Sequence, residues 1–216
     1  MRLFVLPALI IALWQAPPAP PATLPVAAAA QLTRSLQEAR LHRRHLWRDV
    51  APLNANGTVN AYIEIFRGDR RKWEFSMRHN RRAIDRVMPR AVGGYPVNYG
   101  FVPQTVSYDG DPFDALVLGP PARGGAIVRG LIVGVMHMED ERGLDSKVVL
   151  SPVRAGQPKY PLTDAERERI GRFFNTYKQH EPERFSRVLG WGLPEDGLAF
   201  VRKTHQFFHE AASNPR

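Results

Sequence analysis

The spacing of hydrophobic and polar positions differs between the middle of the chain and its C-terminal part. In the middle, short apolar runs rich in β-branched residues recur at 115–118, 127–138 and 147–150, with glycine and proline between them. Such runs, separated by turn residues, indicate strands. A looser alternation over 59–66 adds one more. The middle of the chain is therefore predicted to form a small sheet or barrel.

The C-terminal part instead shows helical spacing. Thr163-Asp164-Ala165-Glu166 is a capping box, in which Thr163 caps the helix and Glu166 reaches back. A second helix is predicted from about 194 to 211. The fold class is therefore mostly β with flanking helices (α+β). The residues expected to face inward are Ile170, Phe173, Phe174 and Tyr177 in the first helix and Phe200, Phe207 and Phe208 in the second.

The N-terminal thirty residues differ in composition from the rest of the chain. Arg2 precedes an apolar run over 3–14, and a Pro/Ala-rich stretch follows. This order is typical of a secretory signal peptide, and the run is shorter than the ~20 residues that span a bilayer. We predict a signal peptide over 1–30, which places the protein in the periplasm or outside the cell. Residues 31–54 are predicted to form a helical or linker extension, with its helix over 31–50.

The amino-acid composition excludes some kinds of functional site and favours some kinds of binding partner. The chain has 216 residues, 44% of them hydrophobic, which is enough to bury a core. It has no cysteine, and this excludes disulfides, thiolate metal sites and cysteine nucleophiles. The formal net charge of +9 favours anionic partners such as nucleic acid, anionic lipid or phosphorylated small molecules.

Acidic residues cluster in this basic chain at Asp109, Asp111 and Asp114. In an extended segment Asp109 and Asp111 point to one side, and Pro112 bends the path so that Asp114 can return. Two carboxylates ~4 Å apart repel by about 4 kcal/mol at an effective dielectric of about 20, so the cluster favours a hard cation, Mg²⁺, Mn²⁺ or Ca²⁺. An EF-hand is excluded, because Asp114 and Pro120 stand where glycine and glutamate are needed. The alternative is an Asp-rich turn whose side chains cap backbone groups.

A second acidic group extends this pattern. Asp140 and Asp145 flank a predicted turn at Arg142-Gly143. Glu64 and Glu74 lie in or near another strand-like stretch. Because these carboxylates gather at several strand ends of a basic chain, we predict a site for more than one metal ion.

Basic and phenolic side chains lie between and after the acidic segments. Lysine, arginine and tyrosine donate hydrogen bonds to phosphate oxygens. Together with Mg²⁺-binding carboxylates they suit phosphoryl transfer, which needs charge neutralisation and positioning. Each also has a structural interpretation, as a core phenol, a solvated cation or a partner of a helix dipole. The candidates are Lys72, Arg86, Tyr95, Tyr99, Tyr177 and Lys178.

The order and spacing of these motifs resemble those of the family I soluble inorganic pyrophosphatases. Asp109-Gly110-Asp111-Pro112-Phe113-Asp114 is the family's signature, and the resemblance covers roughly residues 55–210. It implies an inorganic pyrophosphatase domain over 55–212, folded as an OB-type Greek-key β-barrel with the C-terminal helices packed outside. The other matching motifs are Ile63-Glu64-Ile65, Lys72-Trp73-Glu74, Asp85-Arg86, Tyr95-Pro96-Val97-Asn98-Tyr99-Gly100, Asp140-Glu141, Asp145-Ser146-Lys147 and Tyr177-Lys178.

The resemblance also implies a role for each motif residue. Asp111 resembles the residue that accepts a proton from the nucleophilic water. The implied metal ligands are Asp109, Asp114, Asp140 and Asp145, with Glu64 acting through water. The implied substrate-binding residues are Lys72, Arg86, Tyr99, Tyr177 and Lys178. The implied supporting residues are Glu74, Tyr95, Glu141 and Lys147.

The implied reaction is hydrolysis of inorganic pyrophosphate to two orthophosphates by a metal-bridged hydroxide. Several Mg²⁺ ions are implied at each active site, with Mn²⁺ as a substitute. The implied assembly is a homo-oligomer that binds pyrophosphate as its small-molecule substrate, with no specific nucleic acid and no transmembrane segment in the mature chain. Typical members are cytoplasmic, so the cytoplasm is the alternative location.

The sequence departs from the family pattern in places, and other functions stay open. Phe66 stands where the family usually has proline, and residues 1–50 have no counterpart in the common core. One rival is a non-catalytic barrel that binds nucleic acid through its basic surface, and another is a hydrolase of polyphosphate or nucleotides. His205 and His209 are four residues apart on a predicted helix but lack a third ligand, so we interpret them as surface or core residues.

Overall fold

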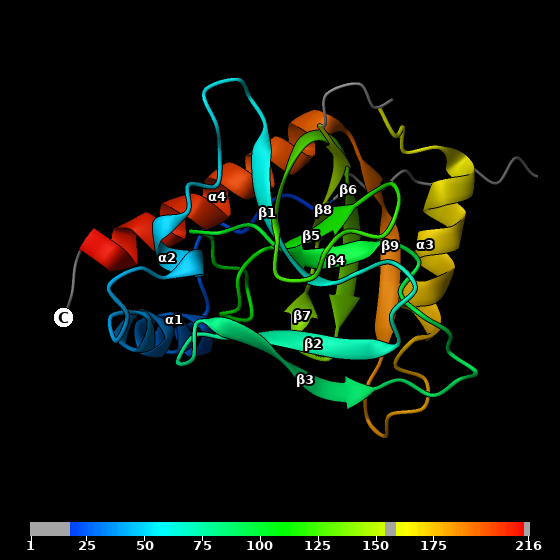
Figure 1. The fold of residues 1–216 in the computed structure, drawn as a ribbon, viewed down its shortest axis with the longest axis horizontal. Helices are drawn as coiled ribbons and strands as arrows, with labels where there is room; N and C mark the ends of the chain where they lie inside the picture. Colours follow the sequence, from blue (N-terminus) through cyan, green and yellow to red (C-terminus); the bar gives the residue numbers. More distant parts are fainter. Residues whose placement is uncertain (1–17, 154–158, 214–216) are drawn as a thin grey trace, which may run out of the picture.

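A computed structural model describes residues 18–153 and 159–213 of the chain. Figure 1 shows strands wrapped into a barrel, with α3 and α4 on its outside and the β2–β3 hairpin beside it. None of the helices in these two segments is long and apolar enough to cross a membrane. The helices are α1 (Val26–Ala39), α2 (Leu46–Asp49), α3 (Asp164–Thr176) and α4 (Pro194–Ser213). The strands are β1 (Val59–Ile65), β2 (Arg71–Ser76), β3 (Arg81–Val87), β4 (Asn98–Phe101), β5 (Asp114–Val117), β6 (Ile127–Asp140), β7 (Gly143–Leu144), β8 (Lys147–Pro152) and β9 (Ser186–Gly192).

The main sheet closes on itself. Its strands follow the order β1-β4-β5-β8-β6, and β6 pairs back with β1. The β5–β8 pair is parallel, and the other pairs of this ring are antiparallel. Closure leaves no free edge within the ring. The predicted OB-type barrel with the C-terminal helices outside is therefore confirmed.

A β-bulge interrupts β1 at Glu64. The register with β4 shifts between Ile63 and Ile65, so Ile63 packs in the barrel interior and Ile65 packs in the outer cluster under α3. A bulge of this kind redirects a side chain. The Glu64 carboxylate points toward β2, where its Oε1 accepts a hydrogen bond of 2.6 Å from the Phe75 backbone N–H.

Glycine is required where β4 crosses β1. A methyl group at Gly100 would lie 1.7 Å from the carbonyl oxygen of Tyr62. Both groups belong to the backbones of paired strands, so neither can move away without breaking the pairing. Gly100 therefore allows β4 to lie close against β1, and Tyr99 is the residue next to it in β4.

Alternating side chains of the strands build two apolar clusters. In β8, Val148 and Leu150 face the barrel interior, while Val149 faces outward. Phe200 and Val201 of α4 complete the interior cluster. The outer cluster packs under α3. It includes Ile170, Phe173 and Phe174 of α3 and Tyr177 at the helix's C-terminal cap, all buried as predicted.

A third cluster joins α1 and α2 to the barrel. Leu32 and Leu36 of α1 pack with Trp47 of α2 and with Phe207 and Phe208 of α4. Burying each leucine contributes about 1.5–3 kcal/mol. An isolated helix of this length is marginal in water, so packing against α4 is what holds α1 in place.

The helix predictions are right at α4 and partly wrong elsewhere. Thr163 caps α3 through the Glu166 backbone N–H, but the Glu166 side chain binds Arg169 and does not reach back. The single helix predicted over 31–50 is two helices, and α1 begins earlier, at Val26. The reason is the alanine run before Gln31, which favours helix and places Ala28 on the buried face. Helix α1 crosses the predicted leader boundary at Ala30, and residues 1–17 of that leader lie outside the described residues.

Two glycine-to-alanine changes should act on stability in opposite directions. Gly100→Ala should lower the free energy of unfolding by about 1–3 kcal/mol or more, because the added methyl overlaps backbone atoms. Gly171→Ala, in α3, meets nothing nearer than Trp191 at 3.9 Å and should raise it by about 0.5–1 kcal/mol. Urea unfolding of both variants measures the difference, and equal effects would contradict the described strand approach.

Candidate active site

Most of the predicted functional residues line one cavity of about 470 Å³. The cavity lies between the barrel and the β2–β3 hairpin, with α1 and the end of α3 at its rim. Side chains from distant parts of the chain meet there. The predicted residues that line it are Glu64, Lys72, Glu74, Tyr95, Tyr99, Asp109, Asp111, Asp114, Asp140, Glu141, Asp145, Tyr177 and Lys178.

Two predicted residues do not line the cavity. Lys147 is buried behind it, with 1% of its surface exposed. Arg86 is paired with Asp85 and with Glu181, each at 2.7 Å. In this arrangement Arg86 points to the acids of its own strand and of the loop after α3.

The loop before β5 folds tightly around its own acids. The Asp111 backbone N–H donates to Asp109 Oδ1 at 3.0 Å, and the Ser107 N–H donates to the Asp111 carbonyl at 2.7 Å. Gly110 has a φ of +89°, in the left-handed region that glycine favours. The capping turn considered from the sequence is thus present, and the Asp109 and Asp111 carboxylates still border the cavity.

Parallel pairing of β5 and β8 brings the next set of charges together. Ala115 is opposite Val148, so the residues before them, Asp114 and Lys147, start their strands at the same end. Lys147 Nζ lies 2.5 Å from Asp114 Oδ2 and 2.8 Å from Asp145 Oδ1. Burial opposes the charge of Lys147, but the two carboxylates outweigh it and raise its pKa above the usual range.

Tyr99 adds a neutral donor to the same group. Its hydroxyl donates to Asp114 Oδ2 at 2.6 Å. Burial, and then the charge of Asp114, raise the pKa of Tyr99 well above its ordinary value. Burial and the charge of Asp145 do the same for the pKa of Tyr177. Both phenols therefore keep their protons at neutral pH and remain donors.

Lys178 holds the acids on the opposite wall. Its Nζ lies 2.8 Å from Asp140 Oδ2 and 3.0 Å from Glu141 Oε2. Burial alone would raise the pKa of Asp140, but the Lys178 hydrogen bond and the Arg142 N–H bring it below its ordinary value. The alternative interpretation of Lys178, as a partner of the helix dipole, is therefore insufficient, because its ammonium binds carboxylates of β6 and the following turn.

Burial, together with crowding of like charges, makes three of these carboxyl groups hard to ionise. Burial, then repulsion by Asp114 and Asp109, raise the pKa of Asp145 to about 7 despite Lys147. Burial, then Asp109, raise the pKa of Asp111 to about 6. Burial, then Asp114, raise the pKa of Glu64. A surplus of negative charge around one cavity is what bound cations relieve.

Arg142 is a functional candidate that the sequence prediction treated only as a turn residue. Its guanidinium lies 2.6 Å from Asp109 Oδ2 and 3.1 Å from Asp111 Oδ2. Because these partners are about thirty positions earlier in the chain, the only local signal was its place directly after Asp140-Glu141.

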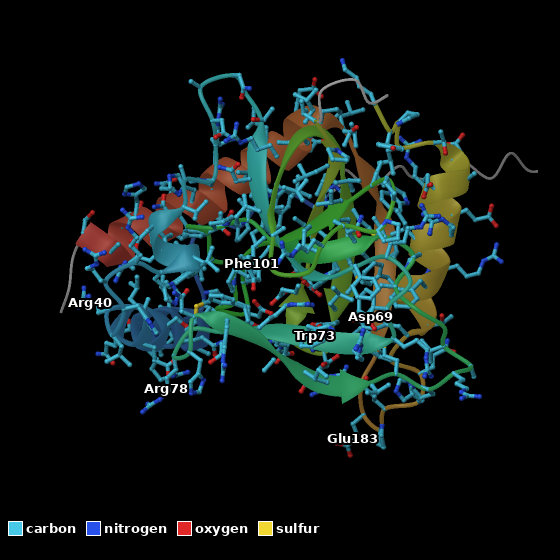
Figure 2. The ribbon with its side chains drawn as sticks, in the orientation of Figure 1. Arg40, Asp69, Trp73, Arg78, Phe101 and Glu183 are labelled. Carbon is cyan, nitrogen blue, oxygen red and sulfur yellow. The ribbon has the colours of Figure 1, made fainter. Side chains whose placement is uncertain are left out.

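The hairpin wall carries Lys72 and Glu74, whose charged groups lie 2.5 Å apart. Asp69 lies just before β2, at the start of the hairpin. Its carboxylate accepts hydrogen bonds from the Trp73 indole at 3.0 Å and from Arg71 Nε at 2.9 Å. Figure 2 labels Asp69 and Trp73 along this wall, below Phe101 of the barrel. The Phe75 and Phe101 rings, 5.3 Å apart, pack the hairpin against β4.

The donor set suits Mg²⁺ although its groups are not gathered as ligands. Over 18–153 and 159–213, no three acidic or histidine side chains stand together as a metal centre. The carboxylates are instead paired with Lys147, Arg142 and Lys178. All the cavity's anionic donors are carboxylate oxygens, which hard cations prefer. The pKa values of Glu64, Asp111 and Asp145 are raised by burial and by neighbouring carboxylates, which bound cations would counter, so the residues fit a magnesium site.

Proteins with similar sequences and structures are inorganic pyrophosphatases. The inorganic pyrophosphatase from Saccharolobus solfataricus is 34% identical over 153 residues, 67% of this chain and 88% of the relative. The one from Helicobacter pylori is 37% identical over 149 residues, 65% of this chain and 86% of the relative.

Solved structures of inorganic pyrophosphatases are also similar to this chain. The inorganic pyrophosphatase of Coxiella burnetii is 36% identical, with a TM-score of 0.68, and the match covers 74% of this chain and 99% of that one. The inorganic pyrophosphatase of Thermus thermophilus is 32% identical, with a TM-score of 0.69, covering 77% and 99%. The sequence pattern of the family described as inorganic pyrophosphatase matches residues 61–209, the stretch that contains nearly all of the barrel, the hairpin and most of the residues that line the acidic cavity. On this agreement of sequence, fold and site, the chain belongs to the inorganic pyrophosphatase family.

Proposed function

We propose that this chain hydrolyses inorganic pyrophosphate to two orthophosphates in the acidic cavity. The observation that carries the proposal is the meeting of carboxylates with lysine, arginine and tyrosine donors around one space of about 470 Å³. A volume of this order suits a small molecule. Phosphoryl transfer to water needs positioning and charge neutralisation more than covalent chemistry.

Magnesium is the proposed cofactor, with Mn²⁺ as a substitute. Asp109, Asp114, Asp140 and Asp145 would hold the ions, and Glu64 would act as an outer ligand. When bound, Mg²⁺ neutralises phosphate oxygens and makes water more acidic. Lys147 stays behind Asp114 and Asp145 and keeps their carboxylates oriented toward the cavity.

The remaining residues bind the substrate and handle the proton. Asp111, which borders the cavity, is proposed to take the proton of the attacking water. Tyr99 and Tyr177 offer neutral hydroxyl donors, and Lys72 and Lys178 offer charged ones. Tyr95, Glu74 and Glu141 support these groups. Arg86 would join them by leaving Glu181 for a phosphate oxygen.

The rival functions fit this cavity less well. A nucleic-acid backbone would be repelled by the carboxylates at its rim. Phosphate release measured in parallel from pyrophosphate, tripolyphosphate and ATP separates these substrates, and salt-dependent DNA binding without phosphate release would favour the first rival.

Asp111→Asn should lower kcat by roughly 10²–10⁴-fold at saturating Mg²⁺, because the amide cannot accept the proton. The substitution keeps the shape of the side chain, so the fold should be unchanged. Asp164→Asn is the matched control, because Asp164 lies at the exposed start of α3 with 98% of its side chain accessible. If Asp111→Asn turns over at the wild-type rate, the proposal that Asp111 accepts the proton is wrong.

Removing divalent metal should abolish phosphate release, and adding Mg²⁺ should restore it. Independently of activity, Mg²⁺ should raise the melting temperature, because ligands of the native state stabilise it. The increase should shrink in Asp140→Asn and persist in Asp164→Asn. Full activity in the presence of EDTA, or an equal thermal shift in the two variants, would contradict metal binding by the cavity acids.

Export and assembly are further parts of the proposal. Residues 1–30 are proposed as the export signal, which places the protein in the periplasm or outside the cell, with the cytoplasm as the alternative. The proposed homo-oligomer is supported by large apolar side chains left exposed on β3 and near β9, Ile84, Val87 and Leu193 among them.

Sequencing the N-terminus of the protein recovered from the periplasmic fraction tests the export signal. The mature chain should lack the apolar run over 3–14 and should retain Gln31. A chain that begins at Met1 and stays in the cytoplasm would rule out the signal.

A further inference from the structure

The N-terminal helix α1 borders the cavity although it precedes the family match, which begins at residue 61. Three of its side chains, Gln31, Ser35 and Glu38, belong to the cavity wall. They lie one turn or nearly one turn apart, so a single face of α1 meets the site. The part of the chain outside the family match thus contributes directly to the site.

Gln31 contacts the residue proposed to take the proton. Its amide Nε2 donates to Asp111 Oδ1 at 2.7 Å. The other carboxylate oxygen, Oδ2, accepts from Arg142 Nη1 at 3.1 Å. The Asp111 side chain is therefore fixed at both oxygens, once by a neutral donor and once by a charged one.

The approach of α1 to this loop is close and well supported. A methyl group at Gly110 would lie 2.7 Å from Gln31 Cβ and 3.1 Å from the Ala28 carbonyl oxygen. Glycine at this position therefore lets the helix lie against the loop. Behind it, the Trp47 indole donates to the Thr105 carbonyl at 2.9 Å, which ties the segment after α1 to the start of the same loop.

We propose that Gln31 is a positioning residue for Asp111. The inference rests on the proposed function, since it assigns Gln31 through the role of Asp111. A neutral amide orients the carboxylate without competing for its charge. Loss of this contact leaves the Asp111 carboxylate held at Oδ2 by Arg142 but no longer at Oδ1. Misplacement of a reacting group by about 1 Å can cost up to about 100-fold in rate.

The test compares substitutions on α1 in the full-length chain with Mg²⁺ present. Gln31→Ala should lower kcat by about 10-fold or more while KM and the melting temperature stay near the wild-type values. Gln31→Glu fills the same volume but cannot donate when ionised, so it should lose at least as much. Gln37→Ala is the matched control, because Gln37 is exposed on the same helix and lies outside this cavity.

A double-substitution cycle separates positioning from a structural effect. In an Asp111→Asn background, Gln31→Ala should change kcat much less than it does in the wild type. Equal kcat for Gln31→Ala and Gln37→Ala, additive effects in the cycle, or a fall in melting temperature that accounts for the lost rate would each overturn the inference. Absence of pyrophosphate hydrolysis in the wild type would instead overturn the proposed function itself.

Discussion

Repulsion among buried carboxylates is the constraint on which the rest of the site depends. Asp114 and Asp145 share one ammonium group, that of Lys147, which is almost wholly inaccessible to solvent. Leaving an isolated charge buried costs several kcal/mol, so neither acids nor lysine could occupy this position alone. Burial, and then the charges of Asp114 and Asp109, still raise the pKa of Asp145 after this pairing, and bound cations would relieve the remaining negative charge.

The barrel stabilises this concentration of charge by holding several of the acids on its strands, with Glu64 in β1, Asp114 in β5 and Asp140 in β6. The β1 bulge redirects Glu64 out of the pleat, and the parallel β5–β8 pair places Asp114 beside Lys147. Helix α3 ends at the cavity, where Lys178 reaches the acids at the end of β6. Packing of strands and helix therefore sets the geometry, and the charged groups do not have to hold themselves in place.

Sequence alone predicts what local spacing encodes. The Thr163 cap, the inward face of α3 and the run from Asp109 to Asp114 are each contained in a few consecutive residues. The β2–β3 hairpin and β9 were missed because their half-exposed residues lack a clear alternation of polar and apolar positions. The partners of Arg142 and Gln31 were missed because they lie 31 and 80 positions away, where only the folded chain brings them together.

Helices α1 and α2 connect the two walls of the cavity. Gln31 holds the Asp111 loop, while the segment after α1 holds the hairpin tip: His42 Nε2 lies 2.8 Å from the Arg78 carbonyl oxygen, and the Leu46 N–H donates to Asn80 Oδ1 at 2.9 Å. Figure 2 shows Arg40 and Arg78 at the same corner of the molecule. Because the hairpin carries Lys72 and Glu74, a shift of α1 would displace the loop and the hairpin together. The N-terminal segment thus contacts both the Asp111 loop and the β2–β3 hairpin, which form two walls of one cavity.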